Sequence, residues 1–96
     1  MLESKYVKLQ ITNIDRNLSE EDFKKLFEKF GPLEECVLVM DKDTGKSKGF
    51  GFVVIAKEAS AKKAVEMLNG RAVNRMKIKV KLLAWFYWFV LELTEQ

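Results

Sequence analysis

The chain has 96 residues, a net charge of +3, 48% hydrophobic residues and 32% charged residues. This is the composition of one globular domain, and it excludes a chain that is disordered throughout. With no histidine and a single cysteine, Cys36, the sequence also excludes an intrachain disulfide, a cysteine-based zinc site and histidine-dependent nucleophilic catalysis. We therefore expect a protein that is not an enzyme and that uses no cofactor and no metal.

The charges are unevenly distributed along the chain. From Lys42 to Lys81 there are eleven lysines or arginines and three acids, whereas residues 20–35 are mixed and slightly acidic. A chain polarised in this way can present a basic surface to a polyanion. On charge alone, a solvated lysine-rich surface without a partner is an equally good interpretation.

The first predicted elements are a strand and an amphipathic helix. Leu9 and Ile11 alternate with polar neighbours, which is the period-two pattern of a half-buried strand. Ser19 is a suitable helix N-cap, and the three acids after it favour the positive end of a helix dipole. Apolar residues then recur at helical spacing, at Phe23, Leu26, Phe27 and Phe30. The pair Gly31-Pro32 ends this helix.

The rest of the chain supplies three strands and a second helix. Two β-rich runs, 35–40 and 50–55, flank a polar loop, and a helix is predicted over 58–69. In the last predicted strand, Ile78, Val80 and Leu82 alternate with lysines. The order βαββαβ predicts an α+β fold of the split-βαβ, ferredoxin-like type. In this fold two helices cover one face of a four-stranded antiparallel sheet.

This arrangement leaves the second face of the sheet open. In the third strand Gly51, Val53 and Ile55 have the parity of the core, so Phe50 and Phe52 point outward. Lysines of the outer strands surround them. Exposed aromatic rings cost hydrophobic free energy, so we expect this face to bind something.

Two segments carry a resemblance to a known family. Lys48–Ile55, KGFGFVVI, matches the pattern basic-Gly-aromatic-Gly-aromatic-Val-x-aromatic at every position but the last, and it lies on the third strand. Leu9–Ile14, LQITNI, is similar to the companion hexapeptide of the first strand. With this element order, the chain resembles the RNA-recognition motif (RRM) family over about residues 5–82.

The resemblance implies that the open face binds single-stranded RNA. Phe50 and Phe52 would stack on bases or sugars, and Lys48 would contact a phosphate. The further residues expected at this RNA site are Lys8, Gln10, Thr12, Lys77, Lys79 and Lys81. Such a protein would act inside the cell, in the nucleus or the cytoplasm.

The sequence departs from the family pattern at two positions. Gln10 stands where the hexapeptide usually carries an aromatic platform, and an amide hydrogen-bonds a base edge but stacks poorly. Ile55 replaces the last aromatic residue of the octapeptide. Because residue 55 has core parity, we expect this second change to affect packing rather than binding.

The C-terminal segment is not explained by the resemblance. We divide the chain into a domain, 1–82, and an apolar aromatic extension, 83–96. In the extension five aromatic residues are consecutive: Trp85, Phe86, Tyr87, Trp88 and Phe89. The apolar run of residues 82–91 has ten residues, against the roughly 20 of a membrane-spanning helix, so we expect no membrane span.

Three interpretations of this segment remain open. It covers the sheet as a lid, it buries itself in a second copy or another protein, or it adds stacking surface for RNA. The lack of lysine and arginine within it argues against the third. The alternative to RNA binding is therefore a protein-interaction domain that dimerises or docks a partner through the sheet or this segment.

Overall fold

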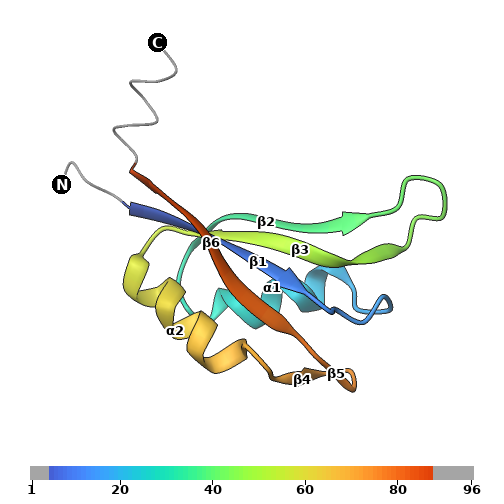
Figure 1. The fold of residues 1–96 in the computed structure, drawn as a ribbon. Coiled ribbons are helices and arrows are strands. Elements are labelled where there is room, and N and C mark those ends of the chain that lie inside the picture. The colour runs from blue at the N-terminus through green and yellow to red at the C-terminus, as the bar shows by residue number, and fades with distance from the viewer. Residues whose placement is uncertain (1–4, 88–96) are drawn as a thin grey trace, which may run out of the picture.

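The computed structural model describes the backbone of residues 5–87 and the side chains of residues 6–83. Within this part of the chain, two helices lie beneath a four-stranded antiparallel sheet with the strand order β2-β3-β1-β6 (Figure 1). Strands β1 (Lys5–Thr12) and β3 (Ser47–Ile55) are central. Strands β2 (Leu33–Met40) and β6 (Lys79–Tyr87) form the two edges. The predicted architecture is confirmed.

The first helix, α1 (Glu20–Glu28), begins and packs as its sequence pattern predicts. The Ser19 hydroxyl accepts a hydrogen bond from the backbone N–H of Asp22 at 3.1 Å, which makes Ser19 the N-cap. Phe23 and Phe27 are buried and meet edge to face, with ring centroids 5.5 Å apart. The remaining members of the apolar stripe, Leu26 and Phe30, are partly buried against the same core.

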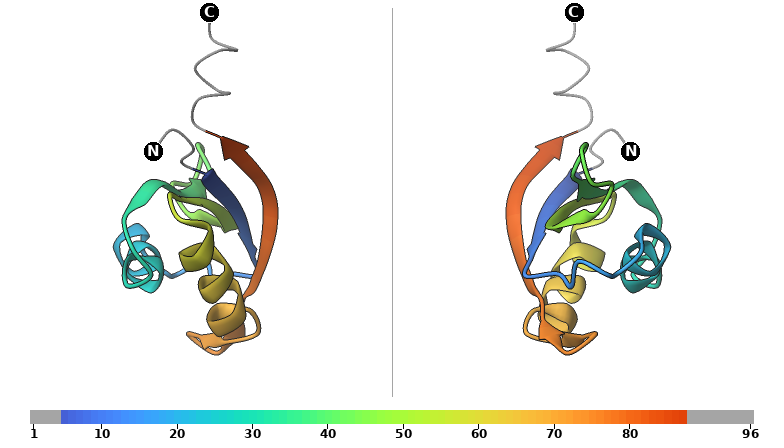
Figure 2. Two further views of the ribbon diagram at one scale, coloured as in Figure 1. Left: turned by 90° about the vertical axis from the view of Figure 1, so that its left-hand side faces the viewer. Right: turned by 90° about the vertical axis from the view of Figure 1, so that its right-hand side faces the viewer.

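The second helix, α2 (Glu58–Leu68), completes the layer beneath the sheet. Its residues Ala61, Ala64 and Leu68 are fully buried. The end-on views of Figure 2 show both helices on the same side of the sheet. Leu9 and Ile11 of β1 point into the core between these layers and are fully buried. The other face of the sheet is therefore free of helices in the described part of the chain.

Gly51 allows α1 to pack closely on β3. A Cβ atom at this position would clash with the carbonyl oxygen of Val37 and would lie 3.0 Å from the ring of Phe23. A side chain here would therefore push the strand and the helix apart. Gly51 therefore faces the core. Val53 and Ile55 lie on the same side of the strand and are fully buried.

The last strand of the sheet begins later than the sequence predicts. Lys77 does not belong to the four-stranded sheet. It pairs with Ala72 in a small hairpin of β4 (Ala72–Val73) and β5 (Met76–Lys77). Asn74 and Arg75 turn this hairpin with positive φ angles of 53° and 73°. The alternation of lysines with apolar residues concealed this hairpin, because it continues unbroken into β6.

Strand β6 also extends further than predicted. It continues through residue 87, so its backbone crosses the proposed boundary at residues 82 and 83. Leu83 forms a bulge, because Lys8 pairs with Ala84 whereas Leu9 pairs with Leu82. Among the aromatic residues, Trp85, Phe86 and Tyr87 belong to this strand and pair with residues 5–7 of β1. Trp88 and Phe89 lie outside the described residues.

No helix within residues 5–87 has the length and apolar character needed to cross a membrane.

We expect the substitution Gly51→Ala to destabilise the fold. The new methyl group must displace the Val37 backbone or the Phe23 ring, and overpacking of this kind typically costs about 1–3 kcal/mol. Urea unfolding should show a lower midpoint with an unchanged slope.

The matched control is Gly45→Asn in the loop between β2 and β3. Gly45 has a φ of +74°, which asparagine tolerates, and no atom lies within 4 Å of its Cβ position. This variant should unfold within about 0.5 kcal/mol of wild type. Equal stabilities of the Gly51→Ala protein and wild type would show that the close approach has no energetic role.

Candidate nucleic-acid interface

Phe50 and Phe52 form an aromatic pair on the open face of β3. Both side chains are half-buried, and neither belongs to the core cluster beneath the sheet. Their ring centroids lie 6.1 Å apart with an interplanar angle of 90°. The two rings therefore present faces in perpendicular directions, rather than one flat surface.

The strand register places four chemically different side chains in one row across the sheet. Phe52 pairs with Val37 of β2 on one side and with Gln10 of β1 on the other, and Gln10 pairs in turn with Lys81 of β6. The row thus runs from an apolar side chain through an aromatic ring and an amide to a cation. A strand of RNA lying along this row would meet stacking, hydrogen-bonding and charged groups in succession.

Lys8 is in contact with the aromatic pair. Its Nζ atom lies 5.0 Å from the centroid of the Phe52 ring, which is a cation–π contact. Lys8 also pairs with Val54, whose side chain is 8% exposed although it shares the outward parity of the two phenylalanines. Val54 is absent from the core cluster, so its burial arises on the open side of the sheet.

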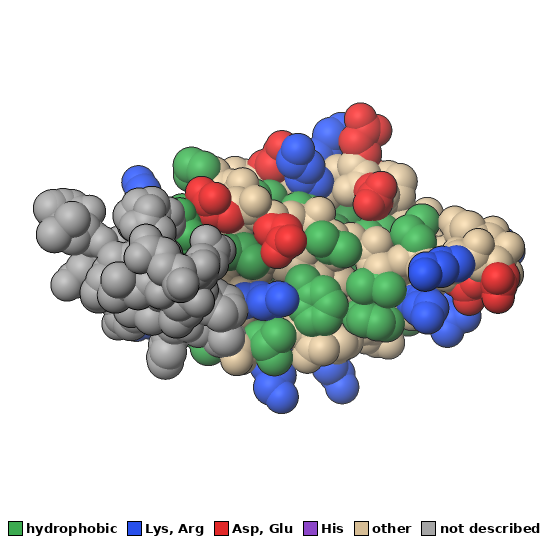
Figure 3. Space-filling view, turned by 90° about the horizontal axis from the view of Figure 1, so that it is seen from above, with side chains coloured by type: hydrophobic (Ala, Val, Ile, Leu, Met, Phe, Trp, Pro, Cys, Tyr) green, Lys and Arg blue, Asp and Glu red, His purple; other side chains and the backbone are tan. Residues whose placement is uncertain are grey.

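Both cations and acids border the apolar centre of this face. Figure 3 looks onto the open face and shows green hydrophobic side chains over the sheet, with blue lysines or arginines and red acids around them. Glu35 of β2 is one of the acids on this side, because it pairs with the outward-facing Val54. Lys79 pairs with Thr12 at the beginning of β6, and Lys48 is exposed at the beginning of β3. Lys77 is exposed too, but in the β4–β5 hairpin beside the sheet.

Two loops bring further charged groups to the beginning of β3, and the sequence analysis did not identify these groups as part of the site. Arg16 follows β1, and Asp41 and Lys46 lie in the connection between β2 and β3. Together with Lys48 they line an open cavity of about 430 Å³ beside Phe50. The loop after β1 is fixed by a 2.9 Å hydrogen bond from the Ile14 backbone N–H to the carbonyl oxygen of Gly49. Loop residues have no periodicity, so the only signal was that they flank the two family segments.

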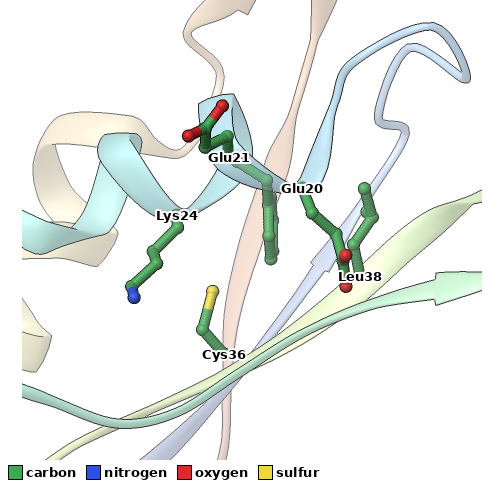
Figure 4. Close-up of a pocket in the computed structure, with 6 residues that line it drawn as sticks. Glu20, Glu21, Lys24, Cys36 and Leu38 are labelled. Carbon is green, nitrogen blue, oxygen red and sulfur yellow. The ribbon is translucent and has the colours of Figure 1, made fainter.

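A different cavity lies between α1 and β2. Figure 4 shows Cys36 and Leu38 of β2 facing Glu20, Glu21 and Lys24 of α1, around a volume of about 270 Å³. Burial raises the pKa of the Cys36 thiol, an effect that Lys24 opposes and nearby glutamates reinforce. The thiol is therefore protonated at neutral pH, as expected for a packed side chain and unlike a reactive nucleophile. In residues 5–87 no three acidic or thiol side chains gather into a metal-binding cluster.

Comparison with known proteins identifies the family. Residues 9–79 match the RNA recognition motif. The chain belongs to this family of RNA-binding domains. The crystal structure of the RNA-binding protein PG1 is similar, with 30% identity and a TM-score of 0.75 over 80% of this chain and 93% of that one.

Two structures of larger RRM proteins are also similar. RNA recognition domains 1 and 2 of Sex-lethal from Drosophila melanogaster match with 27% identity and a TM-score of 0.77, over 81% of this chain and 50% of theirs. A complex of the Sxl-lethal protein with RNA matches with 27% identity and a TM-score of 0.76, over 80% of this chain and 46% of that one. The resemblance inferred from the octapeptide and the hexapeptide is confirmed at the level of family and fold.

We expect Cys36 of this RRM domain to react slowly with thiol reagents. Because its pKa is raised, little thiolate is present at pH 7.5, and the rate should increase with pH through a range above that of a free cysteine. Reaction with a chromogenic disulfide measures this rate in the folded protein. The same protein in urea is the control, and a folded rate equal to the unfolded one would contradict the protection we infer.

Proposed function

We propose that this domain binds single-stranded RNA on the open face of its sheet. The observation that supports the proposal best is the aromatic pair, Phe50 and Phe52, left outside the core with the ammonium group of Lys8 over the Phe52 ring. Membership of the RRM family supports RNA as the ligand class. The nucleus and the cytoplasm both suit such a function, so we also propose an intracellular location.

The perpendicular rings suggest how the strand would lie. A base stacked on Phe52 and a group packed on Phe50 would have perpendicular planes, so two consecutive bases would not remain stacked on each other. A base on one ring and a ribose on the other satisfies this geometry. Single-stranded RNA permits such splaying, whereas a duplex does not, which favours the single strand as ligand.

Lys8 would move when a base stacks on Phe52. The contact between its ammonium group and the ring contributes about 0.5–1 kcal/mol at an exposed site. A stacked base contributes about 1–3 kcal/mol, so stacking prevails. The displaced ammonium group would remain beside the nucleotide and contact a phosphate, together with Lys48, Lys79 and Lys81. Thr12 and Gln10 would hydrogen-bond the RNA between them.

The aromatic segment supports a second candidate function, self-association through β6. Strand β6 pairs with β1 on one side, and no described strand pairs with its other side. An unpaired edge that continues into aromatic residues is a template for another strand. We therefore retain the division into a domain, 1–82, and an extension, 83–96, as a functional proposal. In it, Trp85, Phe86, Tyr87, Trp88 and Phe89 dock a second copy or a partner protein.

For RNA binding, we expect a Phe50→Ala/Phe52→Ala double variant to lose most of its affinity. Loss of one stacked base at about 1–3 kcal/mol corresponds to roughly 5- to 150-fold weaker binding. Fluorescence anisotropy with labelled single-stranded octanucleotides measures this affinity. Binding by wild type should also weaken with salt, with a log–log slope of about −0.7 for each phosphate that a lysine neutralises.

Phe30→Ala is the matched control for the aromatic variants. Phe30 is also partly buried, and Lys29 also places its Nζ near the ring, 5.7 Å from the centroid, but this pair follows α1 on the helical side. This variant should keep its RNA affinity as long as it remains folded by circular dichroism. Equal losses in the two proteins would contradict the assignment of the sheet face as the RNA site, and absence of binding by wild type would refute the function.

For self-association, we expect wild type to form dimers at micromolar concentrations and Leu83→Lys to shift the equilibrium towards monomer. Leu83 is 44% exposed at the bulge of β6, and a lysine there places equal charges on two edges that would have to meet. Sedimentation equilibrium at several loading concentrations measures the association. A wild-type protein that remains monomeric would exclude the second copy and leave a different protein as the partner.

A further inference from the structure

The cavity at the beginning of β3 has a polar lining that differs from the rest of the open face. Its volume is about 430 Å³, and Phe50 forms one part of its wall. The charged groups in its wall are the carboxylate of Asp41 and the cations of Arg16, Lys46 and Lys48. It therefore offers a ring for stacking, a strong hydrogen-bond acceptor and several donors within one space.

The Asp41 carboxylate is held in place by its own loop. Its Oδ1 atom accepts hydrogen bonds from the backbone N–H groups of Asp43 at 2.8 Å and Thr44 at 3.2 Å. These two bonds, with smaller contributions from Lys48 and Arg16, lower the pKa of the carboxyl group. Within the described part of the chain, the second oxygen, Oδ2, accepts no hydrogen bond. An ionised acceptor is thus left available to a ligand.

The cationic donors line the same cavity as the carboxylate. Arg16 and Lys48 also line a neighbouring cavity of about 420 Å³ beside Asn13 and Gly49, so both cations lie between the two spaces. In Figure 3 the blue and red side chains at the right-hand end of the sheet mark this mixed-charge region around the loop between β2 and β3. A ligand on Phe50 would meet both the carboxylate and the cations.

The carboxylate distinguishes a base from a phosphate. Three cations would attract a phosphate to the cavity, and Asp41 weakens this attraction while providing an acceptor that a phosphate cannot use. A neutral base with one edge of donors and another edge of acceptors satisfies both kinds of group. Guanine carries N1–H and N2–H₂ donors side by side on one edge, and the O6 and N7 acceptors on another. Adenine, cytosine and uracil each offer a carboxylate fewer neighbouring donors.

We propose that the Asp41 cavity is a guanine-selective subsite, in which a guanine of single-stranded RNA packs against Phe50. Asp41 accepts from its N1–H and N2–H₂ groups, and Arg16 or Lys48 donates to O6 and N7. This inference rests on the proposed RNA-binding function, which it extends from the class of ligand to a base preference. It gives the loop between β2 and β3 a role in specificity.

The test compares U-rich octanucleotides that carry one central guanosine, inosine, adenosine or cytidine, with an all-uridine strand as reference. Wild type should bind the guanosine strand about tenfold more tightly than the adenosine or cytidine strand. Inosine lacks the N2 amino group, so it should bind with intermediate affinity. Fluorescence anisotropy at one fixed salt concentration provides all five dissociation constants.

Asp41→Asn is the decisive variant. Its amide oxygen still accepts the two backbone hydrogen bonds of the loop, but a donor replaces the free oxygen. Guanosine preference should fall below about threefold, and guanosine and inosine strands should become equivalent, while the all-uridine affinity stays within about twofold. Asp43→Asn makes the same change of charge in the same loop, but residue 43 does not line the cavity, so this control should keep the preference.

The outcomes separate this inference from the function on which it rests. Binding of all strands without a guanosine preference, or a preference that Asp41→Asn retains, would overturn the guanine subsite and leave RNA binding intact. Equal losses of preference in Asp41→Asn and Asp43→Asn would also overturn it, since the effect would then be general charge. Absence of binding to every octanucleotide would refute the RNA function and the subsite together.

Discussion

The packing of Phe23 on the backbone of Gly51 is the constraint on which the open face depends. At Gly51 the Phe23 ring of α1 closely approaches the strand itself, and this contact commits Gly51, Val53 and Ile55 to the core side. Successive side chains of a strand point to opposite faces. Phe50 and Phe52 must therefore lie on the side away from the helices, where both remain half-buried. A core contact thus creates the candidate binding surface.

The division of charge follows from the same two-layer arrangement. Three acids occupy the first turn of α1, where they favour the positive end of its dipole, and this helix lies beneath the sheet. The cations of β6 and of the loops lie around the other face. Because the layers are separated by the core, the acids of α1 do not neutralise the cations beside the aromatic pair. The open face nevertheless carries acids of its own, because Glu35 pairs with the outward-facing Val54 and Asp41 lines the cavity beside Phe50.

The features that the sequence predicted are those encoded by short periodic patterns. The stripe of α1, its cap at Ser19 and the parity of Phe50 and Phe52 each follow from residues within a few positions of one another. The octapeptide lies on the third strand of the predicted βαββαβ order, which is where the family carries it. This agreement allowed the family to be predicted. Residue 55 is fully buried, so the substitution of an aromatic by Ile55 is indeed a matter of packing.

The features that escaped prediction depend on contacts between distant residues or on backbone turns. Lys77 continues the alternation of lysines and apolar residues that marks β6, but it pairs with Ala72 in a hairpin that the pattern does not reveal. The side-chain amide of Asn13 donates a 2.9 Å hydrogen bond to the carbonyl oxygen of Lys77. The bulge at Leu83 likewise arises from the register between β6 and β1. The cavity of Asp41 required two loops, far apart in the chain, to meet at one end of β3. No local pattern contains that information.

The replacement of an aromatic platform by Gln10 shifts the balance of the whole interface. One stacked base contributes about 1–3 kcal/mol, whereas a micromolar complex requires about 8 kcal/mol. The difference has to come from phosphate contacts and from groups that read base edges. Phosphate contacts carry no sequence information, so the choice of RNA falls to the edge-reading groups. In the proposed interface these groups would be Gln10, in the row of Phe52, and the charged groups beside Phe50, so selectivity would depend on neighbours of the aromatic pair as well as on the rings.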